Sequence, residues 1–282
     1  MRFNVKTILA IALAIAPFCA WATGAPPDDS LTLAREGRAI FDHTPQLAPK
    51  YVGDVLSCAS CHLNSGKAAY AAPMWGAYTR YPRYQKKAGR VVSFKQRIRE
   101  CFIFSEHGIA PPMNGHTIRA LDAYAQYLTY RHGTPYGQYH FLVPTSYVAP
   151  GSGYVPPLKT TTGSSVAGRA DFAGHCATCH GVRGQGRHLA SGLYAPPLWG
   201  PRSFALRAGM GNPAMAARFI WQNMPYGNGR SLSPQMARDI ADFVDSHPRP
   251  NPREAIAALW RHDPHDPHDL HGRMTVFAAV AH

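Results

Sequence analysis

Long apolar stretches are absent from most of this sequence of 282 residues. The one such stretch lies near the N-terminus, is shorter than the roughly 20 residues of a bilayer span, and is interrupted by Pro17. Arg2 and Lys6 form a positive end before it, and Ala-Trp-Ala at 20–22 suits signal cleavage. We therefore expect residues 1–22 to be a secretory signal peptide rather than a membrane anchor. We expect the mature protein to be periplasmic, with no membrane span.

Acidic residues are also scarce. The sequence has 16 Asp and Glu against 29 Lys and Arg, a formal net charge of +13 at pH 7. A basic surface favours anionic substrates or acidic redox partners. Nucleic acid is the general alternative, but here the charges are scattered and the export signal directs the chain away from the genome. We expect no nucleic-acid partner.

The cysteine count leaves no pair for a structural disulfide. Of the six cysteines, Cys19 leaves with the signal peptide and four form two Cys-x-x-Cys pairs. Cys101 remains alone. An odd thiol in an oxidising compartment needs a specific explanation.

The two cysteine pairs are each followed directly by a histidine. The motifs are Cys58-x-x-Cys61-His62 and Cys176-x-x-Cys179-His180. This spacing suits covalent haem attachment, because each thiol can add to one vinyl group and the histidine can then bind the iron. A redox or zinc pair is the alternative for one copy, but two copies in an exported chain favour two covalently bound haems c.

The chain is built from two copies of one unit. The first copy begins with an expected helix over residues 31–43, which contains Gly37-x-x-x-Phe41, and the second begins near Gly168-x-x-x-Phe172. A glycine at this position lets a second helix cross closely. The copies therefore predict the same helix crossing twice.

Each copy also ends in an expected amphipathic helix, over residues 117–131 and 234–246. We predict an all-α fold of two tandem class I cytochrome c domains, each wrapped around one covalently bound haem. The expected segments are a signal peptide (1–22), an N-terminal domain (23–144), a linker (145–167), a C-terminal domain (168–250) and a weakly structured tail (251–282). The tail contains His262, His265, His268 and His271. Repeated histidines can bind metal, but we assign them no function.

The repeat also predicts the second ligand of each iron. Met224 follows Trp199 at about the same separation as Cys101 follows Trp75, and each comes after an expected helix, over 214–222 and 93–99. We therefore expect Met224 to bind the second iron and Cys101 the first. A thiolate ligand lowers the potential of a haem and can also act as a nucleophile, whereas methionine raises the potential.

Met113 is the alternative ligand of the first haem, because Pro-Pro-Met at 111–113 is similar to a cytochrome methionine loop. In that interpretation Cys101 is an inert buried thiol. Arg97 and Arg99 favour the first interpretation, since nearby cations stabilise a thiolate.

At these residues the chain resembles the thiosulfate dehydrogenase (tetrathionate-forming) family of dihaem cytochromes. The similarity covers about residues 31–250. The matching motifs are Cys58-x-x-Cys61-His62-Leu-Asn, Tyr81-Pro-Arg-Tyr84, Arg97-x-x-x-Cys101-x-x-x-Ser105, Cys176-x-x-Cys179-His180-Gly and Asn223-Met224-Pro225 with Gly227.

The resemblance implies an oxidoreductase that couples two thiosulfates to tetrathionate, or catalyses the reverse. It implies that His62 and Cys101 bind the first iron and His180 and Met224 the second. It further implies that Arg97 and Ser105 bind substrate, with a second basic residue among Arg83, Lys87 and Arg90. Electrons would leave through the second haem to an external acceptor such as a small cytochrome c.

The sequence departs from the family next to the serine. Phe104 precedes Ser105 where members often have a charged residue, and Glu106-His107-Gly108 replaces Met-Asn-Gly. This puts the substrate and the preferred direction in doubt more than the ligation. Two other functions stay open: a cytochrome c4-like electron carrier with Met113 on the first haem, and a cytochrome subunit of a sulfur-oxidising complex.

Overall fold

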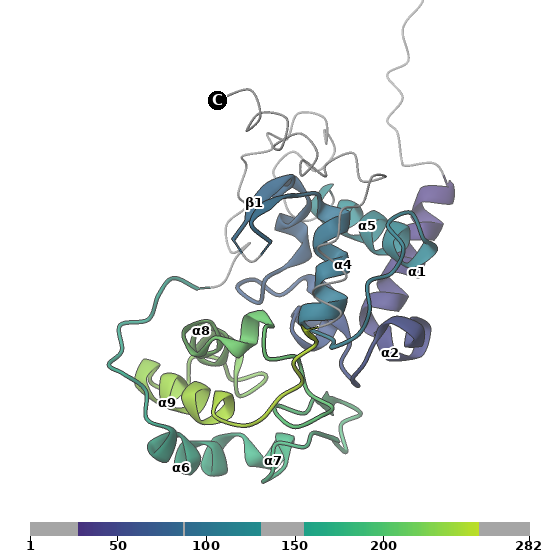
Figure 1. Cartoon of the computed structure of the whole chain (residues 1–282). Helices are drawn as coiled ribbons and strands as arrows, with labels where there is room; N and C mark the ends of the chain where they lie inside the picture. Colours follow the sequence, from purple (N-terminus) through teal and green to yellow (C-terminus); the bar gives the residue numbers. More distant parts are fainter. Residues whose placement is uncertain (1–27, 87, 131–154, 254–282) are drawn as a thin grey trace, which may run out of the picture.

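The computed structural model describes residues 28–86, 88–130 and 155–253 (Figure 1). The expected signal peptide, Lys87, the first part of the expected linker and the tail histidines lie outside the described residues. None of the helices in the described ranges has both the length and the apolar character that crossing a membrane requires.

The first domain, purple through blue to teal in Figure 1, contains three helices of more than two turns and several short turns of helix. Its elements are α1 (Asp28–Asp42), α2 (Thr44–Leu47), η1 (Pro49–Tyr51), η2 (Cys58–Ser60), α3 (Leu63–Gly66), η3 (Met74–Gly76), η4 (Tyr78–Arg80), β1 (Arg83–Gln85), β2 (Arg90–Val92), α4 (Phe94–Phe104) and α5 (His116–Leu128). β1 and β2 pair antiparallel, with Arg83 opposite Val92.

The second domain, green to yellow, repeats this helical plan. Its elements are α6 (Ser165–His175), α7 (Ala177–His180), β3 (Arg187–His188), β4 (Tyr194–Ala195), η7 (Gly209–Gly211), α8 (Pro213–Asn223) and α9 (Pro234–Asp245). β3 and β4 also pair antiparallel. The described chain is thus two helical domains with two very short hairpins, which fits the predicted all-α cytochrome c class.

Both predicted helix crossings are present. α1 crosses α5 at Gly37, where an added Cβ would overlap the carbonyl of Ala120, and α6 crosses α9 at Gly168, where it would overlap the carbonyl of Asp239. Phe41 and Phe172, one turn later, are buried in the respective cores. The Gly-x-x-x-Phe pattern therefore fixes the same close contact in both domains.

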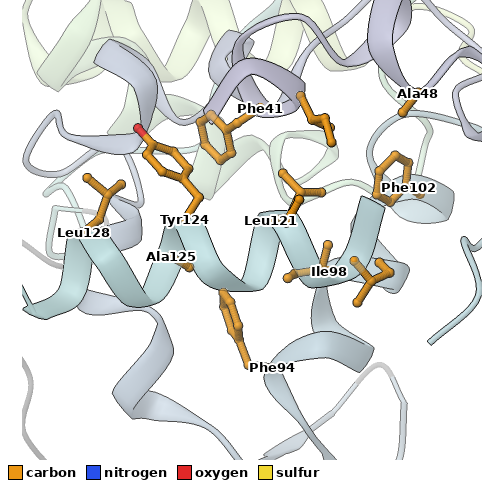
Figure 2. Close-up of a cluster of buried hydrophobic side chains, with 12 residues drawn as sticks. Phe41, Ala48, Phe94, Ile98, Phe102, Leu121, Tyr124, Ala125 and Leu128 are labelled. Atoms are coloured by element: carbon orange, nitrogen blue, oxygen red, sulfur yellow. The ribbon is translucent and has the colours of Figure 1, made fainter. Parts of the chain in front are cut away.

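The core of the first domain lies between α1, α4 and α5 (Figure 2). Phe41 contacts Tyr124 edge-on, with ring centroids 5.6 Å apart, and Phe102 is 1% exposed at the other end of the cluster. In the second domain Phe172, Trp199 and Phe243 form the corresponding aromatic cluster. The two cores are separate, as expected for two domains.

α4 differs from the prediction. The helix was expected to end near Arg99, but it begins after Ser93, whose hydroxyl accepts a hydrogen bond from Gln96, and continues to Phe104. Phe102 and its two successors are buried, and this burial extends the helix by more than a turn. Cys101 therefore lies inside α4, whereas Met224 follows the end of α8.

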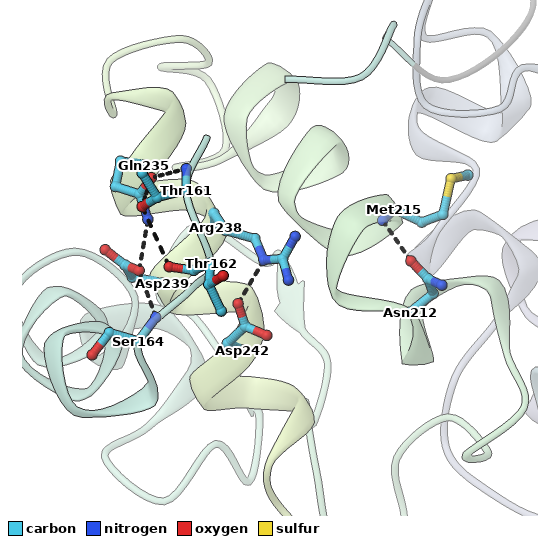
Figure 3. A network of polar contacts seen from close by, with 9 residues as sticks. All are labelled: Thr161, Thr162, Ser164, Asn212, Met215, Gln235, Arg238, Asp239 and Asp242. Atoms are coloured by element: carbon cyan, nitrogen blue, oxygen red, sulfur yellow. Dashed lines mark hydrogen bonds and ion pairs between the residues drawn. The ribbon is translucent and has the colours of Figure 1, made fainter. Parts of the chain in front are cut away.

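The end of the expected linker lies against α9 (Figure 3). The amide of Thr161 donates to Gln235 at 2.9 Å, and the amide of Ser164 donates to Asp239 at 2.7 Å. α6 begins at Ser165, three residues before the expected domain boundary. These contacts attach residues 161–164 to the second domain.

Candidate active site

The first Cys-x-x-Cys-His motif lies in a half-buried turn after η1. The amide of Cys58 donates to the hydroxyl of Thr44 at 3.0 Å, which anchors η2 against the start of α2. Nδ1 of His62 lies 2.6 Å from the carbonyl oxygen of Ala72. Because a carbonyl can only accept, Nδ1 carries the proton and Nε2 presents a lone pair. Burial lowers the pKa of His62, which keeps the ring neutral.

The second motif repeats this geometry on α7. Nδ1 of His180 lies 2.8 Å from the carbonyl oxygen of Pro196, so the same tautomer is selected. Burial lowers the pKa of His180 as well. Cys176 is half-buried, whereas Cys179 is exposed. Each histidine is therefore oriented to bind a metal through Nε2.

A cavity of about 490 Å³ lies beside the first motif. It contains both thiols and the ring of His62, and Phe41, Met74 and Leu121 give it apolar walls. Its size falls in the range of roughly 300–1,000 Å³ that is usual for cofactor sites. Two thiols and a neutral imidazole in one apolar cavity are the donor set that a covalently attached haem requires. The residues present fit this cofactor.

The three predicted catalytic residues line the same cavity. Arg97 and Cys101 lie on α4 and Ser105 directly follows its last residue; at intervals of four, the three share one face. Nη1 of Arg97 forms an ion pair with Oε2 of Glu100 at 2.9 Å, and Glu100 is 1% exposed. The pKa of Arg97 is raised, mainly by the negative charge of a Cys101 thiolate and, more weakly, by Tyr81 and Glu100.

The residues of the open alternatives lie in different places, and the ligand assignments of Cys101 and Met113 stay predictions. Met113 is not among the described residues that line this cavity, whereas Cys101 shares it with His62. Of the three candidate basic residues, Arg83 lines the cavity and Arg90 is buried on β2 outside its described lining. Met224 directly follows α8, and its assignment to the second haem stays a prediction.

Two buried carboxyl groups beside the cavity were missed from the sequence. Oε1 of Glu106 lies 3.5 Å from Sγ of Cys58, and burial raises the pKa of Glu106 well above its usual value. Asp54 accepts from the amide of Leu56 at 2.8 Å, and burial raises its pKa to about 8. The only sequence signal was Glu106 itself, which departs from the family pattern.

The contribution of the second domain was also missed. The second-domain residues in the cavity lining are Phe204, Ala208, Gly209, Met210 and Met215. No periodicity or motif marks these residues, because they act through a contact between domains. The cavity is therefore formed by both domains together.

Two family descriptions match this chain. The family described as SoxA/TsdA, cytochrome c domain, matches residues 51–129, and the cytochrome c family matches residues 165–248. The first match covers the cavity residues of the first domain except Phe41, and the second covers the second attachment motif.

Curated relatives match across both domains. The chain is 42% identical over 219 residues to the thiosulfate dehydrogenase of Stutzerimonas stutzeri strain A1501, a match that covers 77% of this chain and 68% of the relative. It is 39% identical over 226 residues to the thiosulfate dehydrogenase of Thiomonas intermedia strain K12, covering 80% and 68%.

A solved structure is similar as well. Thiosulfate dehydrogenase (TsdBA) from Marichromatium purpuratum, in its as-isolated form, matches with a TM-score of 0.71 at 36% identity. The match covers 86% of this chain and 53% of the other. The chain thus spans about half the length of that solved chain.

Proposed function

The chain belongs to the thiosulfate dehydrogenase family of dihaem c-type cytochromes, and we propose on this premise that it oxidises two thiosulfates to tetrathionate with Cys101 as nucleophile. The family is one of oxidoreductases that carry two covalently bound haems c. One observation supports the proposal above all others: Arg97, Cys101 and Ser105 face one cavity together with His62. A simple electron carrier has no use for an arginine and a third thiol in the lining of a haem cavity.

This proposal assigns to each haem the residues that would bind it. Cys58 and Cys61 would hold the first haem covalently, and His62 and Cys101 would bind its iron. Cys176 and Cys179 would hold the second haem, and His180 and Met224 would bind its iron. When bound, each haem supplies one-electron oxidation and reduction, so the pair matches the two electrons of the reaction.

The nucleophile is the thiolate of Cys101. Its sulfur forms a bond with the outer sulfur of the first thiosulfate, and two electrons leave this sulfur pair. The outer sulfur of the second thiosulfate then attacks the sulfur of the first. The bond to Cys101 breaks, tetrathionate is released, and the thiolate is regenerated. No proton or oxygen atom is transferred, and the net change is two thiosulfates to one tetrathionate and two electrons.

The cations of the cavity counter the repulsion between the two substrates. Thiosulfate is a dianion, and like charges a few ångström apart repel by several kcal/mol at the effective dielectric of a protein surface. Arg97 lies on α4 and Arg83 on β1, so cationic groups reach the cavity from two elements. Ser105 supplies a hydroxyl that can donate to a sulfonate oxygen.

The remaining parts of the proposal concern location and electron flow. Residues 1–22 direct export to the periplasm. Electrons leave from the second haem to an external acceptor such as a small cytochrome c. The same cavity serves the reverse reaction when an electron donor and tetrathionate are supplied.

The test is thiosulfate-dependent reduction of ferricyanide by the purified holoprotein, with tetrathionate quantified. We expect turnover in the wild type and none in Cys101→Gly, with both haems still attached. Met113→Leu is the matched control and should keep its turnover, since Met113 has no role in this mechanism. Turnover that survives in Cys101→Gly contradicts the proposal. Absence of turnover in the wild type in both directions favours the electron carrier or the complex subunit.

A further inference from the structure

Residues 200–211, which we call the covering segment, carry four of the five second-domain residues that line the cavity of Cys101. Phe204, Ala208 and Met210 pack against Leu56 of the first domain, and all four line the cavity. The amide of Ala205 donates to the carbonyl oxygen of Ser105 at 3.2 Å. The covering segment therefore contacts both the cavity wall and the backbone of a proposed substrate-binding residue.

The chain that follows α9 holds the covering segment in place. The amide of Gly200 donates to the carbonyl oxygen of Pro248 at 2.9 Å, and the amide of Leu206 donates to that of Pro250 at 2.7 Å. Arg249 lies between these two points of attachment. Its side chain is therefore within reach of the covering segment.

The side chain of Arg249 is 0% exposed. Nη1 lies 2.7 Å from Oδ1 of Asp245, and Nη2 donates to the carbonyl oxygens of Leu198 at 2.9 Å and Val244 at 2.7 Å. The guanidinium carbon lies 4.4 Å from the ring centroid of Phe204. The buried guanidinium of Arg249 therefore connects α9, the carbonyl of Leu198 and the ring of Phe204, which lines the cavity.

Burying this pair is costly. Desolvation lowers the pKa of Arg249 and raises the pKa of Asp245 to about 6, so each charge is less favourable here than in water. An apolar pair of similar volume is often as stable as a buried ion pair. The ion pair with Asp245 is therefore not needed for the stability of the second domain. What an apolar pair could not replace are the directed contacts of Arg249 with two carbonyl oxygens and the ring of Phe204.

We propose that Arg249 is a positioning residue for the cavity of Cys101, which it serves by holding Phe204 and the covering segment against the first domain. Arg249 touches neither substrate nor haem site. Its effect passes through Phe204 to the cavity wall and through Ala205 to the backbone of Ser105. The link to substrate binding rests on the proposed function, but the link to the covering segment does not.

The test compares Arg249→Lys with Arg238→Lys in the holoprotein. Arg238 pairs with Asp242 at 2.6 Å with the same spacing of four residues, and it does not line the cavity (Figure 3). Lysine keeps the charge but loses the planar fork that contacts two carbonyls and the ring. Two quantities are measured: amide hydrogen exchange by mass spectrometry, and the KM and kcat for thiosulfate.

In Arg249→Lys we expect exchange in residues 200–211 to become about tenfold faster, with α6 and α9 unchanged. We expect KM to rise about fivefold or more, with a smaller change in kcat. Arg238→Lys should change neither quantity by more than about twofold. Phe204→Leu removes the ring but keeps the ion pair with Asp245, and should give the same local change if Arg249→Lys fails to fold.

Three results overturn the proposal: faster exchange spread evenly over the second domain, unchanged exchange in residues 200–211, or an equal effect in Arg238→Lys. A wild type without thiosulfate turnover contradicts the proposed function alone, because hydrogen exchange still decides whether Arg249 holds the covering segment.

Discussion

Gly37 on α1 packs directly against the backbone of Ala120 on α5, with no room for a side chain between them. An added Cβ would overlap the carbonyl of Ala120 and would lie 2.9 Å from Cβ of Tyr124. Gly168 has the same relationship with Asp239 in the second domain. The closest approach of two helices in each domain thus depends on one glycine.

Gly37→Ala should therefore destabilise the protein by about 1–3 kcal/mol, because the helices must separate to admit a methyl group. Gly168→Ala should have a similar effect on the second domain. Gly174→Ala is the control, since this exposed glycine of α6 has open space around it, and there alanine should stabilise by up to about 1 kcal/mol. Chemical unfolding of the three variants measures the effect, and equal stability of Gly37→Ala and Gly174→Ala would contradict it.

Arg97→Lys should lower kcat/KM for thiosulfate by about tenfold or more, equivalent to about 1.4 kcal/mol. Glu100 holds the guanidinium of Arg97 at 2.9 Å, and lysine cannot keep this pair and still present two donors to a sulfonate. Steady-state kinetics measure the change. Arg38→Lys in the more exposed Arg38–Asp42 pair of α1 should have no effect on kcat/KM. An unchanged KM in Arg97→Lys would exclude Arg97 from substrate binding.

Asp54→Asn should change the dependence of stability on pH. The pKa of Asp54 is raised from 3.8 to about 8 by burial, so the folded protein holds a proton that the unfolded chain releases. The free energy of unfolding therefore falls as pH rises between these values. Asparagine keeps the acceptor for Leu56 and removes this titration. We expect Asp54→Asn to be more stable than the wild type at pH 9, by on the order of 1 kcal/mol or more, and similar to it at pH 4. If the free energy of unfolding changed with pH in the same way in the wild type and in Asp54→Asn, the prediction would be wrong.

Met224→His should lower the reduction potential of one haem and leave the other unchanged, because histidine stabilises ferric haem relative to methionine. A spectroscopic redox titration separates the two haems. Met236→Leu is the control, since Met236 packs on the core of the second domain without a proposed ligand role. A shift in the reduction potentials of both haems, or of neither, would contradict the assignment of Met224 as a ligand of the second iron.

Much of this fold could be predicted from local patterns. The Gly-x-x-x-Phe pairs are each encoded within a few residues, and both helix crossings that they predict are present. The end of α4 was misplaced because burial of Phe102 and its neighbours, which no local signal reveals, extends the helix past Arg99.

The candidate site was predictable only in part, for a related reason. Arg97, Cys101 and Ser105 share a helix face, so their spacing alone brings them together. Phe204 and Met210 reach the same cavity through a contact between domains, and Glu106 reaches it from the turn after α4. Such proximity depends on how separate segments pack, which neither periodicity nor motif spacing specifies.

The shared cavity also makes the surroundings of Cys101 depend on both repeated units. The first unit supplies Cys101, and the second supplies Phe204, Ala208 and Met210 of the cavity lining. Separation of the two units would therefore remove part of the lining around Cys101.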